Sequence, residues 1–240
     1  MKRLPKRATA RGSGTYDGTI SVTMLRSYCN EAEANAKDPR HVSAKSARSH
    51  TPRPSSCRFF ITSVEESIMN IRKAEDQDID SIIKVVSLAF NKEQYLQGQK
   101  VVEATLVSEL LNDNDNVVNL VSEDSEIVGH VFISPVSLEP DVGLFCGQVS
   151  PLSVHPDHQS KGIGSSLMWA VIDESRVKGL DVLFLLGDPN YYHRFGFVSS
   201  KVDNVYGISR YFQELELNAG CIPSKETHAH LAPAFSRLGI

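Results

Sequence analysis

The residues best suited to chemistry lie where an apolar run meets an amphipathic segment. The stretch Gln159-Ser160-Lys161-Gly162-Ile163-Gly164-Ser165 places a cation, hydroxyls and two glycines at a predicted helix start. Glycine lets the backbone approach a bulky anion closely, because it has no Cβ. The first N–H groups of a helix lack internal partners and lie at the positive end of the helix dipole. The stretch therefore predicts a binding site for a diphosphate group.

Two other phosphate-binding motifs do not fit these residues. A P-loop places Gly-Lys-Ser or Gly-Lys-Thr after four free residues, whereas Lys161 precedes both glycines here. A dinucleotide-binding fold needs a third glycine after the first strand of its unit. Leu167 holds the third-glycine position, and the motif follows the fourth predicted strand. A lone Gly-x-Gly also serves helix packing, so this motif needs support from elsewhere in the chain.

Apolar periodicity around the motif predicts alternating strands and helices. Ile79, Ile82, Ile83, Val86 and Phe90 recur on one helical face, and the nearly continuous apolar run 181–186 suits a strand buried on both faces. The predicted order is strand 70–74, helix 79–90, helix 101–111, strands 117–122, 126–136 and 143–154, helix 162–178, strand 181–186, helical turn 191–195 and strand 196–198. This order indicates an α/β fold with a mixed sheet.

Two motifs in this order resemble those of the GCN5-related N-acetyltransferases, the GNAT family. Gln159 to Gly164 is similar to their Q/R-x-x-G-x-G/A pyrophosphate motif. Leu186-Gly187-Asp188-Pro189-Asn190-Tyr191-Tyr192-His193-Arg194-Phe195-Gly196-Phe197 resembles their tyrosine-bearing turn, and is most similar to the YhbS-like branch of predicted acetyltransferases. That branch often carries a C-terminal strand closing in Ala-Phe, as 232–235 does here.

The resemblance covers Met69 to about Phe235 and implies one GNAT-like domain over 69–240. Its central sheet would be mixed and flanked by helices, with the fourth and fifth strands splayed apart around acetyl-CoA. The implied reaction moves an acetyl group from acetyl-CoA to a primary amine by direct attack in a ternary complex. A second hypothesis for the enzyme is that it transfers a longer acyl group instead of acetyl. The alternative is a non-catalytic acyl-CoA sensor or a partner-binding module on the same fold.

The family motifs also imply which residues act. Tyr192 lies four residues before Gly196, as the family's general-acid tyrosine does, and Tyr191 takes the role if the turn is shifted by one. Tyrosine has an ordinary pKa of about 10 and can protonate a departing thiolate. The resemblance implies that Leu152, Ser153 and Val154 bind the pantetheine arm, and that Gln159, Ser160, Lys161, Gly162, Ile163, Gly164 and Ser165 bind the diphosphate.

The sequence does not identify the general base or the acceptor amine. By residue type the candidates for the base are His130, His155, His158, His193 and Asp188. A lone strand histidine such as His130 is more often a core residue, and Asp188 beside Pro189 can simply shape the turn. Cys146 has no paired histidine and is not expected to act as a nucleophile. No metal is implied.

The composition excludes several classes of protein. The 240 residues are 41% apolar and 22% charged, as in ordinary globular proteins. No run approaches the roughly 18 apolar residues of a membrane helix. The four cysteines form no Cys-x-x-Cys pair, so we expect reduced thiols, no zinc ribbon and a cytoplasmic protein. A homodimer through the C-terminal strands is compatible with the fold.

Residues 1–68 differ from the rest of the chain in charge. They hold 12 Lys and Arg against 6 Asp and Glu, whereas 69–240 hold 13 against 23. Polar composition and scattered prolines predict a disordered basic extension. It could be an organelle-targeting peptide, a tail for acidic partners, or a segment outside the working protein, which begins at Met69; we favour the last. Because the part predicted to fold is acidic, we expect a cationic amine rather than nucleic acid as partner.

Overall fold

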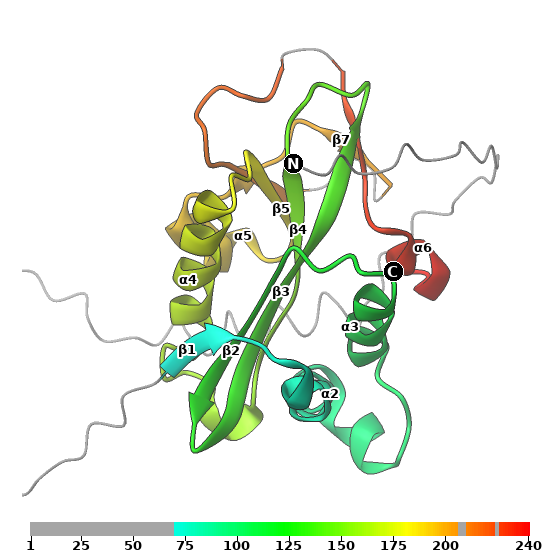
Figure 1. The fold of residues 1–240 in the computed structure, drawn as a ribbon, viewed down its shortest axis with the longest axis vertical. Helices are drawn as coiled ribbons and strands as arrows, with labels where there is room; N and C mark the ends of the chain where they lie inside the picture. The colour runs from blue at the N-terminus through cyan, green and yellow to red at the C-terminus, as the bar shows by residue number, and fades with distance from the viewer. Residues whose placement is uncertain (1–69, 206–209, 224–225) are drawn as a thin grey trace, which may run out of the picture.

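The computed structural model describes residues 70–205, 210–223 and 226–240 (Figure 1). The predicted extension 1–68 and Met69 lie outside the described residues. The strands are β1 (Asn70–Lys73), β2 (Val118–Asp124), β3 (Glu126–Glu139), β4 (Cys146–Val154), β5 (Val182–Leu186), β6 (Val198–Ser199), β7 (Asp203–Asn204), β8 (Phe212–Glu216) and β9 (His228–His230). The helices are α2 (Ile79–Leu96), α3 (Val102–Asn112), α4 (Ile163–Val177), α5 (Pro189–Tyr192) and α6 (Pro233–Leu238), with short 3₁₀ turns η1 (Asp76–Asp78), η2 (Pro156–His158) and η3 (His193–Phe195).

The strands form one mixed sheet, as the order of apolar segments predicted. Its main path is β1-β2-β3-β4-β5-β8-β6, and on this path only the β4–β5 pair is parallel. The tail predicted to be irregular supplies β8, which pairs with all of β5 from Val182 to Leu186. The prediction of a strand at 232–235 is wrong, because residues 233–238 form helix α6. Pro233 stands at the first position of helix α6, where its fixed φ and missing N–H are compatible with a helix start, and Gly239 ends it with φ 70°.

The strands β4 and β5 separate after a short paired stretch. They pair only from Cys146 to Gln148, which lie opposite Val182 to Phe184. Just beyond this stretch the β3–β4 register shifts, so that β4 carries one more residue than β3 between two paired positions. A bulge of this kind bends the strand that carries it. The predicted splay of the fourth and fifth strands is therefore confirmed, and the bulge lies where the gap opens.

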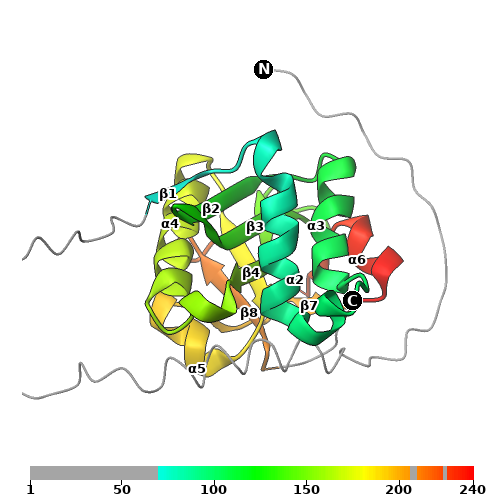
Figure 2. The same ribbon diagram turned by 90° about the horizontal axis from the view of Figure 1, so that it is seen from below.

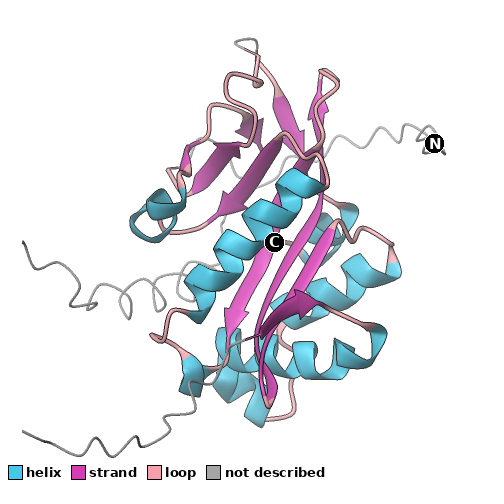
Figure 3. Cartoon of the chain, turned by 60° about the vertical axis from the view of Figure 1, so that its left-hand side comes forward, coloured by secondary structure: helices cyan, strands magenta, loops and turns pink. Residues whose placement is uncertain are grey.

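Helices cover both faces of the sheet (Figure 2). Helices α4 and α5 lie on one face, here called the α4 face, and α2, α3 and α6 lie on the other, here called the α2 face. Helix α4 packs along the strands (Figure 3). Its four apolar residues Leu167, Met168, Val171 and Ile172 are fully buried in the core. Burying one such side chain stabilises a fold by about 1.5–3 kcal/mol. No helix in the described ranges is long and apolar enough to cross a membrane.

On the α2 face, two antiparallel helices cross the strands. Helix α2 starts after the edge strand β1 and packs over β3 and β4. Helix α3 comes back toward β2, because its C-terminal end leads through 113–117 to Val117, whose N–H donates to the carbonyl oxygen of Ile133. The connection between the helices and the first turn of α3 therefore lie on the β4 side of the sheet, as Figure 2 shows.

An ionic cluster fixes the start of α2 against the sheet edge. The Arg72 guanidinium on β1 donates to Asp78 Oδ2 at 2.6 Å and to Glu123 Oε2 on β2 at 3.0 Å. The Asp78 carboxylate also accepts the Glu75 N–H at 2.8 Å. The hydrogen bond from Arg72 lowers the pKa of Asp78, which is nearly buried. This cluster determines where α2 begins to cross the strands.

We expect Asp78→Asn to lower the free energy of unfolding by about 1–3 kcal/mol near pH 7, because hydrogen bonds to a charged group are lost. The folded-state pKa of Asp78 is depressed. Its contribution is therefore present above the unfolded pKa of about 3.9 and lost as the pH falls through the folded value, so the variant and the wild type converge in acid. Urea unfolding measures the difference. Asp173→Asn is the control, since that exposed carboxylate pairs with Arg176 on the helix surface. This substitution should change the free energy of unfolding by less than about 0.5 kcal/mol. Equal losses in both variants would contradict the prediction.

Candidate active site

The turn before α4 offers unpaired backbone N–H groups to a ligand. Gly162 is the N-cap with φ 87°, Ser160 has φ 62°, and no side chain caps the helix. The Ser166 N–H makes the first bond of the helix, to the Gly162 carbonyl oxygen. The preceding N–H groups, from Ile163 to Ser165, have no partner within the helix. Left-handed residues in such a turn create a concave surface of N–H groups, which suits an anion.

Side chains of the turn hold it against the end of β4. Gln159 Nε2 donates to the Val154 carbonyl oxygen at 3.1 Å, so this predicted cofactor residue supports the turn through its side chain. The His155 N–H donates to the Val128 carbonyl oxygen at 2.8 Å. The rings of His155 and His158 meet edge to face, with centroids 5.5 Å apart. Lys161 is exposed at the rim, where its ammonium adds positive charge.

The predicted pantetheine residues lie on an open strand edge. Leu152, Ser153 and Val154 are buried, and on one side they pair with β3. On the other side, β5 has already separated from β4 at Gln148. The second backbone edge of these residues therefore faces the gap without a strand partner in the described part of the chain. Such an edge can hydrogen-bond to an extended ligand.

Tyr192 lies just past the end of β5, across this gap from β4. Its side chain is 2% exposed, and its ring packs against Gly187, where an added Cβ would stand 2.2 Å from Tyr192 Cε2. Asp188 accepts the Asn190 N–H at 2.9 Å and so caps the short helix that carries the tyrosine. Tyr191 packs instead under the Arg194 guanidinium, 4.9 Å from the ring centroid. Gly187 is thus required by the position of Tyr192.

The structure gives His130 and Asp188 structural partners and leaves His193 exposed. His130 is fully buried, and its Nε2 lies 2.9 Å from Asn119 Oδ1. Burial lowers the pKa of His130 to about 3, so the ring is neutral. Asp188 is the helix cap, and His193 is exposed on the surface. Burial raises the pKa of the Cys146 thiol to about 12, which leaves no thiolate nucleophile. Among the described residues, no three His, Cys, Asp or Glu side chains gather to hold a metal ion.

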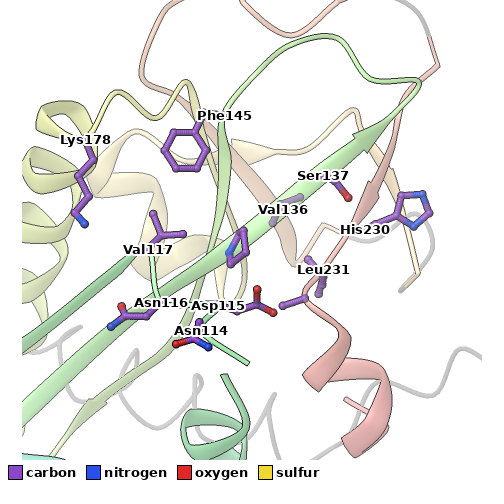
Figure 4. Close-up of a pocket in the computed structure, with 12 residues that line it drawn as sticks. Asn114, Asp115, Asn116, Val117, Val136, Ser137, Phe145, Lys178, His230 and Leu231 are labelled. Carbon is purple, nitrogen blue, oxygen red and sulfur yellow. The ribbon is translucent and has the colours of Figure 1, made fainter. Parts of the chain in front are cut away.

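A separate cavity of about 840 Å³ lies at the other end of β4 (Figure 4). Phe145, just before β4, and Lys178, just after α4, line it, together with residues 114–117, 135–137 and 230–232. Lys178 is at the opposite end of α4 from Gly162. None of the predicted site residues lines this cavity, so it is distinct from the gap between β4 and β5.

The sequence model of the Acetyltransferase (GNAT) domain matches residues 70–199. The chain belongs to the GNAT acetyltransferase family. The family model ends just after the Gly196-Phe197 pair, so it contains both motifs of the candidate site. This confirms the family that the two motifs predicted.

Curated GNAT relatives support the predicted branch. The uncharacterized N-acetyltransferase YhbS of Escherichia coli K12 is 33% identical over 97 residues, which are 40% of this chain and 58% of YhbS. The uncharacterized N-acetyltransferase YjhQ of the same strain is 30% identical over 108 residues, 43% of this chain and 60% of YjhQ. The chain thus spans less than two thirds of the curated relatives it matches.

Solved GNAT structures share the fold. A GNAT family acetyltransferase from Brucella melitensis, in complex with acetyl-CoA, has 29% identity and a TM-score of 0.57, over 70% of this chain and 99% of that one. Escherichia coli YhbS in complex with CoA has a TM-score of 0.64 over 80% of this chain and 98% of that one. Its identity of 23% shows the fold alone.

We expect Gly187→Ala to lower the free energy of unfolding by about 1–3 kcal/mol, because the new methyl group displaces the Tyr192 ring. In a Tyr192→Ala background, Gly187→Ala should lower the free energy of unfolding far less, because no ring is left for the new methyl group to displace. Urea unfolding of the two single variants and the double variant measures this coupling. Strictly additive losses would show that Gly187 does not position Tyr192.

Proposed function

We propose that this chain is an N-acetyltransferase that moves an acetyl group from acetyl-CoA to a primary amine by direct attack in a ternary complex. The observation that carries the proposal is the gap between β4 and β5, which opens beyond Gln148. An uncapped helix N-terminus lies beyond the end of β4, and Tyr192 lies past the end of β5. GNAT membership and the acetyl-CoA in the Brucella structure support the same reading. We propose residues 69–240 as the catalytic domain.

Two sets of backbone groups would bind the co-substrate. The N–H groups from Ile163 to Ser165 would hold the diphosphate at the positive end of α4, with Lys161 adding charge at the rim. The open edge from Leu152 to Val154 would pair with the amides of the pantetheine arm. A backbone N–H on the same edge would polarise the thioester carbonyl as negative charge develops on its oxygen. Each role follows from a backbone position, so side-chain substitutions alter it only indirectly.

The reaction then needs little more than positioning and proton transfer. The lone pair of the amine attacks the thioester carbonyl carbon, the carbon–sulfur bond breaks, and the new amide nitrogen loses one proton. The Tyr192 hydroxyl would give its proton to the departing thiolate. Holding both reactants together removes most of the entropic barrier of a bimolecular encounter.

We expect Gly164→Glu to raise the acetyl-CoA dissociation constant at least about tenfold, because a carboxylate then stands at the phosphate-binding end of the helix. Trp169, the single tryptophan of the chain, lies on α4 and contacts Phe195 with ring centroids 5.2 Å apart. Its fluorescence therefore serves to titrate the protein with acetyl-CoA. Val177→Glu is the matched control, since it adds the same charge at the other end of α4, where the side chain is 81% exposed. Equal affinities for the two folded variants would contradict the phosphate site.

We expect Tyr192→Phe to lower kcat about 100-fold or more, because the proton donor is lost. The ring still fills the space over Gly187, so the dissociation constant for acetyl-CoA should stay within about twofold. Thiol release in the presence of n-butylamine measures the rate. Tyr191→Phe removes a hydroxyl from the neighbouring ring and should be nearly silent. A loss confined to Tyr191→Phe would move the role by one residue. Binding of acetyl-CoA without turnover by the wild type would favour a sensor.

A further inference from the structure

A buried glutamine on β8 binds the chain just past the end of β5. Gln213 is 1% exposed, and its side-chain Nε2 donates to the Gly187 carbonyl oxygen at 2.9 Å. The Gly187 N–H donates to the carbonyl oxygen of Tyr211, which lies just before β8, at 2.9 Å. The β8 segment therefore holds Gly187 on both sides of its Cα, through one backbone bond and one side-chain bond.

The register of the two strands explains how the amide reaches this carbonyl. Gln213 lies opposite Leu185, two positions before Gly187. Residues two apart on a strand carry their side chains on the same face, so Gln213 lies on the face to which position 187 also belongs. The paired register of β5 and β8 ends at Leu186 and Phe212. The side chain of Gln213 thus extends the connection between the strands beyond their last pair.

Gly187 in turn provides the surface on which the Tyr192 ring packs. A Cβ added at Gly187 would stand 2.2 Å from Tyr192 Cε2 and 2.8 Å from Cδ2. On other sides the ring meets Tyr191, Phe195 and Phe197, with ring centroids 4.9 Å, 6.5 Å and 6.1 Å away. Because the ring is confined in this way, a displacement of Gly187 changes where the tyrosine hydroxyl lies.

A second connection to Tyr192 runs through the peptide group that Gln213 holds. The Gly187 carbonyl belongs to the peptide group that leads into Asp188, the N-cap of α5. The Asp188 carbonyl oxygen accepts the Tyr192 N–H at 3.1 Å, and its side chain accepts the Asn190 N–H at 2.9 Å. Because a peptide group is planar, fixing the direction of its carbonyl restricts the backbone of the next residue. The Gln213 amide therefore also restrains the short helix that carries the tyrosine.

A polar side chain is an unusual occupant for this position of the sheet. The neighbours of Gln213 on β8 and β5 include Phe212, Leu215 and Leu185, which belong to the apolar core or pack against it. Glutamine is seldom fully buried, and a buried amide is nearly always hydrogen-bonded. An apolar side chain at 213 would leave the Gly187 oxygen without this donor. The carbonyl that it binds, rather than packing, thus accounts for the glutamine.

We infer that Gln213 is a positioning residue for the proposed transfer: its amide fixes Gly187, and Gly187 fixes the Tyr192 hydroxyl that protonates the departing thiolate. The inference rests on the proposed function and deepens it, because it makes the general acid depend on a residue outside both sequence motifs. Displacing a reacting group by about 1 Å is enough to lower a rate about 100-fold. A single buried hydrogen bond can therefore have a large effect on turnover.

A kinetic double-mutant cycle tests the inference, with n-butylamine as acceptor and thiol release as readout. Gln213→Met keeps the length of the side chain and removes its N–H donors. We expect it to lower kcat about tenfold or more, with the acetyl-CoA dissociation constant from Trp169 fluorescence within about twofold of the wild type. In a Tyr192→Phe background it should change kcat by less than about twofold, because no hydroxyl is left to position. An equal loss of kcat in both backgrounds would show a purely structural role and overturn the inference.

Two further variants separate positioning from general damage to β8. Asn218→Leu is the matched control, because the Asn218 amide also links the β8 segment to β5, by donating to Asp181 Oδ1 at 2.8 Å at the opposite end of β5. Its kcat should stay within about twofold of the wild type. Gln213→Asn keeps the amide but shortens the side chain by one methylene group, so the N–H no longer reaches Gly187. It should lower kcat about fivefold or more, and it carries the same comparison if Gln213→Met does not fold. Wild-type kcat in Gln213→Asn would overturn the inference.

A readout without turnover distinguishes this inference from the proposed function. With 3-fluorotyrosine at the seven tyrosines, Tyr192→Phe identifies the Tyr192 fluorine resonance by its absence. Gln213→Met should shift or broaden this resonance, whereas Asn218→Leu should leave it unchanged. An unchanged Tyr192 resonance in folded Gln213→Met would overturn the positioning role while leaving acetyl transfer standing. A shifted resonance, together with no thiol release by the wild type, would overturn the proposed transfer and leave the dependence of Tyr192 on Gln213 standing.

Discussion

The incomplete pairing of β4 with β5 is the constraint on which the rest of the site depends. One extra residue in β4 shifts its register against β3, and the parallel pairing with β5 ends at Gln148. A backbone edge buried without partners is costly, so some ligand or water must satisfy it. The same separation exposes the start of α4 at one end and leaves Gln148 at the other. A single irregularity in β4 thus lies where the gap between the two strands opens, and the inner end of that gap is at Gln148.

The α4 face supplies a positive electrostatic environment to one end of this gap. Backbone N–H groups at the start of α4 and the helix dipole favour negative charge there. The Arg72 cluster contributes indirectly, because it fixes where α2 starts and hence where the connection leads into α3.

Local sequence predicted the parts of the site that depend on local chemistry. The glycine turn, helix α4, the buried run of β5 and the short helix that carries Tyr192 each follow from neighbouring residues. The parts set by tertiary contacts escaped prediction. β8 is short and carries two glutamates, so its pairing with β5 had no local signal. The predicted C-terminal strand failed because Pro233 stands at a helix start.

The net charge of the folded region acts at long range. Residues 69–240 hold 23 Asp and Glu against 13 Lys and Arg, which attracts cations at a distance. That attraction is screened within about 8 Å at physiological ionic strength, so it raises encounter rates without selecting among amines.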